Sequence, residues 1–313
     1  MFIIDAHCDS ILECYRNSRS LGIRSHKGHL DLPRLSEAGV KIQFFALFPE
    51  TIYKPHWVLH RVLELLDYFW EQYEENKDIL QVIVSKKDLE ECLCSDKIGA
   101  LLAVEGGEAL EGDLRMLKVF YRLGVRSLGL TWNQRNEIAD GVAEEATGGG
   151  LTRFGKQVIR EMNKLGMLID VSHLSERGFW DVLELSEDPV IASHSNCREI
   201  WDHPRNLSDR QLTALANKRG VVCINLVPGF LGPVGAGLSE FFDHIDHVCD
   251  VVGDDYVGIG SDFDGTDVLI PEIPDVTKLF KIVEGLQKRG YTQTSIEKIC
   301  GKNCLRVLKK VLR

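Results

Sequence analysis

The sequence predicts an α/β protein of the (β/α)8 TIM barrel type, and three observations support this fold class. Short apolar runs alternate with longer amphipathic segments along all 313 residues, and eight such runs can be counted, the number that closes this barrel. Most of the runs are apolar on both faces, as strands of a parallel sheet are when both sides are covered. No break in composition divides the chain, so we expect a single catalytic domain over residues 1–313.

The predicted elements follow one another as strand and helix. The eight strands are residues 2–6, 42–48, 100–104, 125–131, 168–171, 190–192, 221–226 and 257–260. Helical periodicity predicts helices over 58–73, 151–165, 176–185, 209–218, 238–252, 276–288 and 295–312. Ser175 and Ser208 stand where N-cap residues belong, and Gly166 is a predicted helix end. We interpret 16–31 and 228–237 as loops over the mouth of the barrel.

Composition argues against several classes of function. The net charge is −10, with 47 acidic and 37 basic residues and no basic face, so nucleic acid is not an expected partner. No stretch reaches the roughly 18 uninterrupted apolar residues of a membrane span, and the N-terminus lacks the features of a signal peptide. The nine cysteines have no regular spacing. We therefore expect reduced core thiols in a cytoplasmic protein that does not bind a membrane.

The predicted strand ends carry residues that bind metal ions. His7 and Asp9 follow the first strand, and residues two apart on a strand face the same way, so both can reach one ion. Glu105 follows directly on the third predicted strand, and His173 and His194 come just after the fifth and sixth. Imidazole and carboxylate groups suit zinc or a similar divalent ion. Because the C-terminal strand ends of a barrel converge at the face where active sites are built, we expect these side chains around one centre.

These ligands are more than one closed metal site requires. Two ions bridged by a carboxylate and a shared hydroxide would use all of them, and such a pair activates water and polarises a scissile carbonyl. Asp262, just after the eighth strand, can take the hydroxide's proton and pass it to the leaving amine. The sequence therefore predicts a hydrolase with two divalent ions, zinc being the expected metal, although manganese, cobalt or iron suit the same ligands. We interpret His244 and His247 as helix-face residues and not as ligands.

The order and spacing of these motifs resemble the membrane (renal) dipeptidase family of zinc peptidases, a branch of the amidohydrolase-like metal-dependent barrels. The resemblance covers nearly the whole chain and is carried by Asp5-Ala6-His7-Cys8-Asp9, Val104-Glu105-Gly106-Gly107, Asp170-Val171-Ser172-His173, Ser193-His194-Ser195 and Gly260-Ser261-Asp262-Phe263-Asp264-Gly265. It implies that His7 and Asp9 bind one zinc ion, that His173 and His194 bind the other, and that Glu105 bridges both.

The resemblance also implies which residues handle the substrate. Asp262 would transfer the proton, and Arg205 would bind the α-carboxylate of the substrate, a role that suits a bidentate guanidinium. Mammalian members have a histidine after the fourth strand that helps to bind the substrate carbonyl oxygen, whereas this sequence has Trp132 there. Stabilisation of the oxyanion would then rest more on the metal, or on Asn133 or Arg135. A homodimer is a further implication of the family.

Three functions remain open at this point. The leading one is hydrolysis of small dipeptides, with the free carboxylate on Arg205 and the free amine near Asp262 and the second metal ion. The same centre could instead hydrolyse N-acyl amino acids, cyclic amides or lactones, because a barrel and its metals say little about the substrate. The third is a catalytically silent, metal-stabilised dipeptide-binding protein, against which the retained Asp262 argues.

Overall fold

A computed structural model describes residues 1–313 and shows a closed barrel of parallel strands. The ring consists of β1 (Ile3–Asp5), β2 (Val40–Leu47), β4 (Ile98–Glu105), β5 (Val125–Gly129), β6 (Leu168–Asp170), β7 (Ile191–Ala192), β8 (Val221–Ile224) and β9 (Val257–Ile259). It closes because β1 pairs with both β2 and β9, and β2 pairs with β4. These are the eight predicted strands, so the predicted fold class is confirmed.

One strand lies outside the ring and was not predicted. β3 (Leu80–Val82) pairs in parallel with the first residues of β4, where Leu80 stands opposite Ile98. β5 pairs with the later residues of β4, and Leu102 stands opposite Val125. Because β4 is eight residues long, it can hold both partners on the same edge. β3 therefore widens the sheet at the N-terminal end of the barrel without entering the ring.

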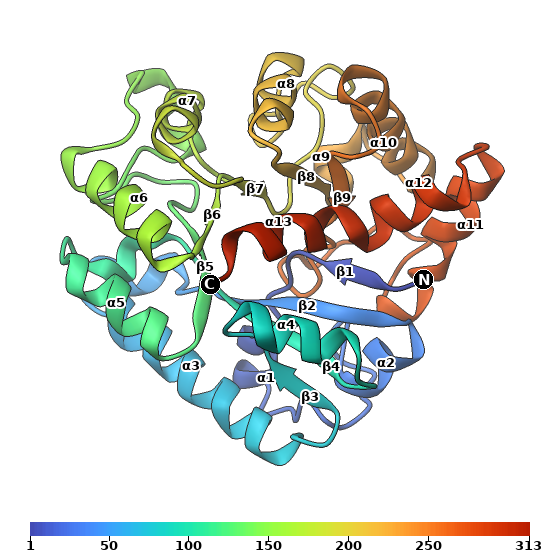
Figure 1. The fold of residues 1–313 in the computed structure, drawn as a ribbon, viewed down its shortest axis with the longest axis horizontal. Helices are drawn as coiled ribbons and strands as arrows, with labels where there is room; N and C mark the ends of the chain where they lie inside the picture. Colours follow the sequence, from blue (N-terminus) through green and yellow to red (C-terminus); the bar gives the residue numbers. More distant parts are fainter.

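Helices surround the ring of strands (Figure 1). Those that match predicted segments are α3 (Val58–Glu75), α6 (Arg153–Leu165), α7 (Glu176–Leu185), α8 (Asp209–Asn217), α10 (Leu238–Val252) and α11 (Phe280–Lys288). Four further helices were not predicted: α1 (Ser10–Arg16), α2 (Leu32–Glu37), α4 (Lys86–Leu93) and α5 (Leu114–Arg122). No helix combines the length and the apolar character that crossing a bilayer requires.

The structure corrects two predicted segments. The first four residues of the predicted loop 228–237 form the short helix α9 (Pro228–Leu231), which begins at a proline whose fixed φ suits a first helical position. The predicted helix 295–312 is three elements: α12 (Gln293–Glu297), a π-helical turn (Lys298–Lys302) and α13 (Asn303–Val311). Within this turn Gly301 packs so closely on Phe2 that a Cβ atom would lie 2.7 Å from the phenyl ring.

The protein has two apolar cores, one outside the ring of strands and one inside it. The larger lies between strands and surrounding helices, and a smaller cluster of 17 buried residues fills the barrel interior. The interior cluster includes Ile4, Phe44 and Leu101 from the strands together with Val307 and Val311 of α13. Figure 1 shows α13 lying across the ring of strands. Because α13 closes the N-terminal end with apolar side chains, the polar residues of the strands are left to the C-terminal end.

The local signals in the sequence act as predicted at three helix ends. The Ser175 hydroxyl accepts a hydrogen bond of 3.1 Å from the Gly178 N–H at the start of α7. Gly166 ends α6 with a φ of 71°, a left-handed conformation that glycine adopts readily. At Ser208 the backbone N–H donates to the Gln211 side chain over 3.0 Å, so the predicted N-cap is part of a capping box.

Candidate metal centre

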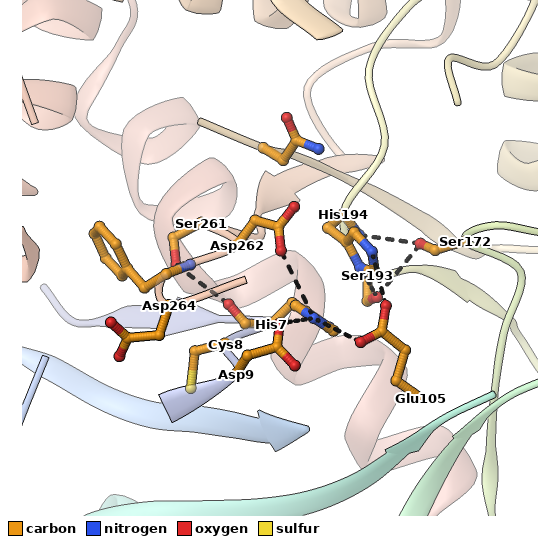
Figure 2. Close-up of polar contacts among 12 residues, drawn as sticks. His7, Cys8, Asp9, Glu105, Ser172, Ser193, His194, Ser261, Asp262 and Asp264 are labelled. Carbon is orange, nitrogen blue, oxygen red and sulfur yellow. Dashed lines mark hydrogen bonds and ion pairs between the residues drawn. The ribbon is translucent and has the colours of Figure 1, made fainter. Parts of the chain in front are cut away.

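The five predicted ligands meet at the C-terminal end of the barrel. His7 and Asp9 follow β1, Glu105 is the last residue of β4, and His173 and His194 follow β6 and β7. All five side chains are buried. Figure 2 shows four of them, His7, Asp9, Glu105 and His194, gathered around one point. They converge because the parallel strands of a barrel all end at the same rim.

Glu105 stands between two pairs of candidate ligands. One carboxylate oxygen, Oε2, lies 3.5 Å from His7 Nε2, which is itself 3.3 Å from Asp9 Oδ2. The other oxygen, Oε1, lies 3.0 Å from His173 Nε2 and 3.5 Å from His194 Nε2. A carboxylate that turns one oxygen to each pair has the arrangement of a bridging ligand between two metal ions.

The polar atoms around Glu105 fit divalent metal ions. The Oδ1 atom of Asp9 is buried and has no hydrogen-bond partner, a costly state that coordination of a cation would relieve. His7, Glu105 and His194 place one ligand atom each within 4.8 Å of one another, and so do His7, Asp9 and Asp262. Nitrogen and carboxylate oxygen donors of this kind suit zinc.

The electrostatics of the cluster also favour added positive charge. Burial lowers the pKa of His173 and of His194 well below the usual range, so both rings are neutral, the form that binds metal ions. Burial also acts to lower the pKa of His7, but Glu105, Asp9 and Asp262 outweigh it and raise that pKa to about 10. Burial raises the pKa of Glu105 well above its usual value. Three acidic residues, Glu105, Asp9 and Asp262, thus face the His7 ring, where a bound cation would also lie close to them.

Asp262 lies on the opposite side of His7 from Glu105 (Figure 2). Its Oδ1 atom is 3.8 Å from His7 Nε2, and burial raises its pKa to about 6. Its φ is 64°, a left-handed conformation that costs a non-glycine residue about 1–2 kcal/mol, and His173 shares this feature with a φ of 66°. Such strain is concentrated at functional sites. Gly265 allows the close approach, since a Cβ there would lie 2.4 Å from both Asp262 and Asp9.

A cavity of about 250 Å³ opens onto these residues. It is lined by four residues of the cluster, Asp9, Glu105, His173 and Asp262, and by the three predicted substrate-binding residues, Arg205, Trp132 and Asn133. The remaining lining residues are Leu12, Arg16, Phe48, Val227, Phe230, Asp264, Gly265 and Thr266. The cavity is smaller than the roughly 300–1,000 Å³ of pockets for drug-sized ligands, so it suits a small substrate.

Arg205 lines this cavity and has an unpartnered hydrogen-bond donor. The side chain is buried, and its Nη2 donates to the backbone carbonyl of His194 over 3.0 Å. Its Nε has no hydrogen-bond partner. Burial lowers the pKa of Arg205 to about 10, so the guanidinium keeps its charge at neutral pH. The predicted carboxylate-binding residue is therefore held beside a metal ligand with hydrogen-bonding capacity to spare.

The two other predicted substrate residues have packing and positioning contacts. Trp132 packs between Phe48 and His173, with ring centroids 5.4 and 5.9 Å away. The Oδ1 atom of Asn133 accepts a hydrogen bond from Nδ1 of His173 over 2.7 Å. Arg135, the alternative oxyanion donor, is paired with Asp140 and does not line the cavity.

Sequence reasoning missed the polar residues beneath the ligands. Asp5 at the end of β1 and Asp170 at the end of β6 are buried and bind the serines that precede Asp262 and His194. The only signal was their place in the same motifs as the ligands. His244 and His247, interpreted as helix-face residues, do not line the cavity. His244 is fully buried and bonds to Cys197 and to Leu231 at the end of α9, and His247 binds Asp209.

Known proteins resemble this chain over its whole length. The sequence model of the membrane dipeptidase family (peptidase family M19) matches residues 1–313. A relative from Claviceps purpurea (strain 20.1), named dipeptidase tcpJ, is 32% identical over 91% of this chain and 69% of its own. The solved structure of the metallopeptidase dipeptidase AC is 30% identical, with a TM-score of 0.94 over 100% of this chain and 99% of that one. A metallopeptidase from Rhodobacter sphaeroides, solved with a phosphinate mimic of the dipeptide L-Ala-D-Ala, is 29% identical, with a TM-score of 0.94 over 99% of each chain. This chain belongs to the membrane dipeptidase family of metallopeptidases.

Proposed function

We propose that this protein hydrolyses the peptide bond of small dipeptides with two divalent metal ions, zinc being the expected metal. Membership of the family supports the reaction class. The Claviceps purpurea relative is named a dipeptidase, and the Rhodobacter sphaeroides structure holds a dipeptide mimic. The arrangement of Glu105 between two pairs of ligands supports two ions over one.

In this proposal the ligands form two sets, one on each side of Glu105, as the distances from its two carboxylate oxygens indicate. His7 and Asp9 hold one ion, His173 and His194 hold the other, and Glu105 is shared. When bound, such ions would supply Lewis-acid chemistry, which polarises a scissile carbonyl and lowers the pKa of the attacking water. Asp262 then accepts the proton of the attacking water at its carboxylate and returns it to the leaving amine.

Arg205 is the residue that would make this protein prefer dipeptides to longer peptides. Its guanidinium donates to the carbonyl oxygen of His194, a ligand, so the site for a substrate carboxylate is fixed directly beside the metal centre. A dipeptide with its terminal carboxylate on Arg205 and its scissile carbonyl at the centre would place one residue between them. The small cavity supports the same limit on the amine side. Trp132 provides an apolar wall and, unlike a histidine, cannot become a cation.

The test is an assay of the zinc-loaded protein on matched substrates. We expect cleavage of Ala-Ala, little cleavage of Ala-Ala-Ala or N-acetyl-Ala, and a large loss on Ala-Ala-amide, which lacks the carboxylate. Comparable cleavage of the tripeptide or of acylated amino acids would instead indicate a broader amidohydrolase. A protein that binds dipeptides and two metal equivalents without turnover would be a binding protein.

Three associated predictions accompany this proposal. Elemental analysis of the purified protein should find two metal equivalents per chain and will identify the native metal. Sedimentation measurements test the homodimer that the family resemblance implies. Cell fractionation tests the predicted cytoplasmic location.

A further inference from the structure

We propose that Asp170 and Ser193 are positioning residues that fix the His194 ring in the tautomer whose Nε2 is free to bind a metal ion. This inference rests on the proposed function only in requiring a metal ion at His173 and His194. It rests on a series of buried hydrogen bonds that runs from Asp170 through Ser193 to His194.

The series begins at the Asp170 carboxylate, which ends β6 in the barrel interior. Its Oδ1 atom accepts the backbone N–H groups of Ser172 and Ser193, each over 3.0 Å. Its Oδ2 atom accepts the hydroxyl of Ser193. The first two bonds clamp the main chain after β6 to the main chain after β7, and only the third reaches a side chain.

The direction of the next bond follows from the single hydrogen of each hydroxyl. Ser193 gives its hydrogen to Asp170, so toward every other group it can only accept. Ser172 Oγ accepts the His194 backbone N–H over 3.1 Å. Because Ser193 can only accept, Ser172 is the donor in the bond of 3.3 Å between the two hydroxyls. The remaining lone pair of Ser193 faces His194 Nδ1 at 2.8 Å, so Nδ1 must carry the ring hydrogen. Figure 2 shows both serines beside His194.

The consequence lies on the other side of the ring. With the hydrogen on Nδ1, His194 presents a lone pair at Nε2 toward Glu105 Oε1, 3.5 Å away. His173 does the same, because the Asn133 oxygen that faces its Nδ1 can only accept a hydrogen bond. The two Nε2 atoms are 2.8 Å apart. Two lone pairs at that distance repel each other unless a cation lies between them, which is the environment that a metal ion requires.

Asp5, at the end of β1 on another side of the barrel, provides an internal comparison. It binds Ser261 through the backbone N–H at 2.7 Å and the hydroxyl at 2.6 Å, as Asp170 binds Ser193. The Ser261 hydroxyl, however, also contacts the carbonyl oxygen of His7 at 3.2 Å and reaches no ring nitrogen. The aspartate–serine clamp is thus used twice, and only the copy at Asp170 continues to a histidine ring.

Two variants separate a positioning role from a merely structural one. Ser193→Ala keeps both main-chain bonds to Asp170 and removes only the hydroxyl, so we expect about tenfold weaker zinc binding at the second site. Asp170→Asn also keeps an oxygen for the main-chain clamp, but its amide must donate to Ser193. Ser193 would then donate to His194 Nδ1 and select the wrong tautomer, so we expect a loss of about 100-fold or more. Ser261→Ala, the matched control, should change zinc affinity at this site less than threefold.

The measurements are competition of each protein with a zinc chelator and 15N NMR of histidine-labelled protein. The spectrum of the wild-type protein should show a hydrogen on His194 Nδ1, assigned by its loss in His194→Gln, and that of metal-free Asp170→Asn should show it on Nε2. Wild-type zinc affinity in Ser193→Ala, or Asp170→Asn binding zinc no more weakly than Ser193→Ala, would overturn the inference. Neither readout depends on peptide cleavage, so a zinc-binding protein that cleaves no dipeptide would refute the proposed function and leave this inference standing.

Discussion

Replacing His244 should remove part of the acid sensitivity of this protein. The side chain has no exposed surface and joins the segment after β7 to the end of α9. Its Nδ1 accepts the Cys197 N–H over 3.0 Å, and its Nε2 donates to the Leu231 carbonyl over 3.0 Å. Burial lowers the pKa of His244 to about 4, although the bond to Leu231 acts to raise it. Protonation would place a hydrogen on Nδ1 and break the bond to Cys197.

The magnitude follows from the difference between the folded and unfolded pKa values. An unfolded histidine has a pKa of about 6.5. Between this value and about 4 the unfolded chain binds a proton that the folded chain does not, so stability falls as the pH drops. The free energy of unfolding should fall by about 2 kcal/mol between pH 7 and pH 5 from this residue, and by about 3 kcal/mol once the pH is below 4.

Urea denaturation of the wild-type protein and His244→Gln at pH 7, 6 and 5 measures this term. The glutamine can still donate to Leu231 but leaves the Cys197 N–H without its acceptor, which should cost about 1–3 kcal/mol at pH 7. The variant should then lose about 2 kcal/mol less than the wild-type protein between pH 7 and pH 5. His26→Gln, at an exposed position, is the control and should follow the wild-type slope. Equal slopes for the wild-type protein and His244→Gln would refute the reasoning.

Three further predictions concern the substrate, the barrel and the metal ions. Arg205→Met should lower kcat/KM for Ala-Ala by about 100-fold, and Arg205→Lys should not restore it because an ammonium lacks the planar fork; equal activity of the methionine variant would contradict the assigned role. In Gly260→Ala a Cβ would lie 1.8 Å from the Ser193 carbonyl oxygen, so we expect a loss of about 3 kcal/mol or more in urea denaturation, whereas Gly229→Ala, with nothing within 4 Å, should be neutral. Chelation of the metal ions should lower Tm, since a ligand at 100 times its Kd stabilises by about 2.7 kcal/mol per site, and added zinc should restore it; an unchanged Tm would count against a metal centre.

The positions of the ligands could be read from the sequence because each follows a strand that the apolar pattern reveals. His7 and Asp9 come directly after β1, and Glu105 is the last residue of β4. Once eight strands are counted, barrel geometry alone brings their C-terminal ends together. The same logic placed Asp262 near His7 without any information on how the chain turns after β9.

Two of the elements that were missed, β3 and α4, carry weak signals. β3 is three residues long, and α4 buries only Leu89 and Cys92, so neither shows a clear period. At the interruption of the last helix Gly301 meets Phe2, a contact between the two ends of the chain that local periodicity does not reveal. Asn133 was correctly placed at the cavity, but its oxygen faces His173, and the direction of a side chain on a loop does not follow from its position in the sequence.

The two aspartate–serine clamps could not be predicted from the sequence either. Asp170 and Ser193 are 23 residues apart and Asp5 and Ser261 are 256 apart, yet both pairs join strands that are neighbours in the ring. Each clamp holds the chain just where it leaves a strand, immediately before His194 in one case and Asp262 in the other. A residue that follows the last residue of a strand has no hydrogen bonds from the sheet to fix its main chain. Here a buried aspartate replaces them by accepting the N–H of the serine that precedes His194 or Asp262. The need for such a clamp arises from ring closure, and for that reason Asp5 and Asp170 became recognisable as positioning residues only in the folded chain.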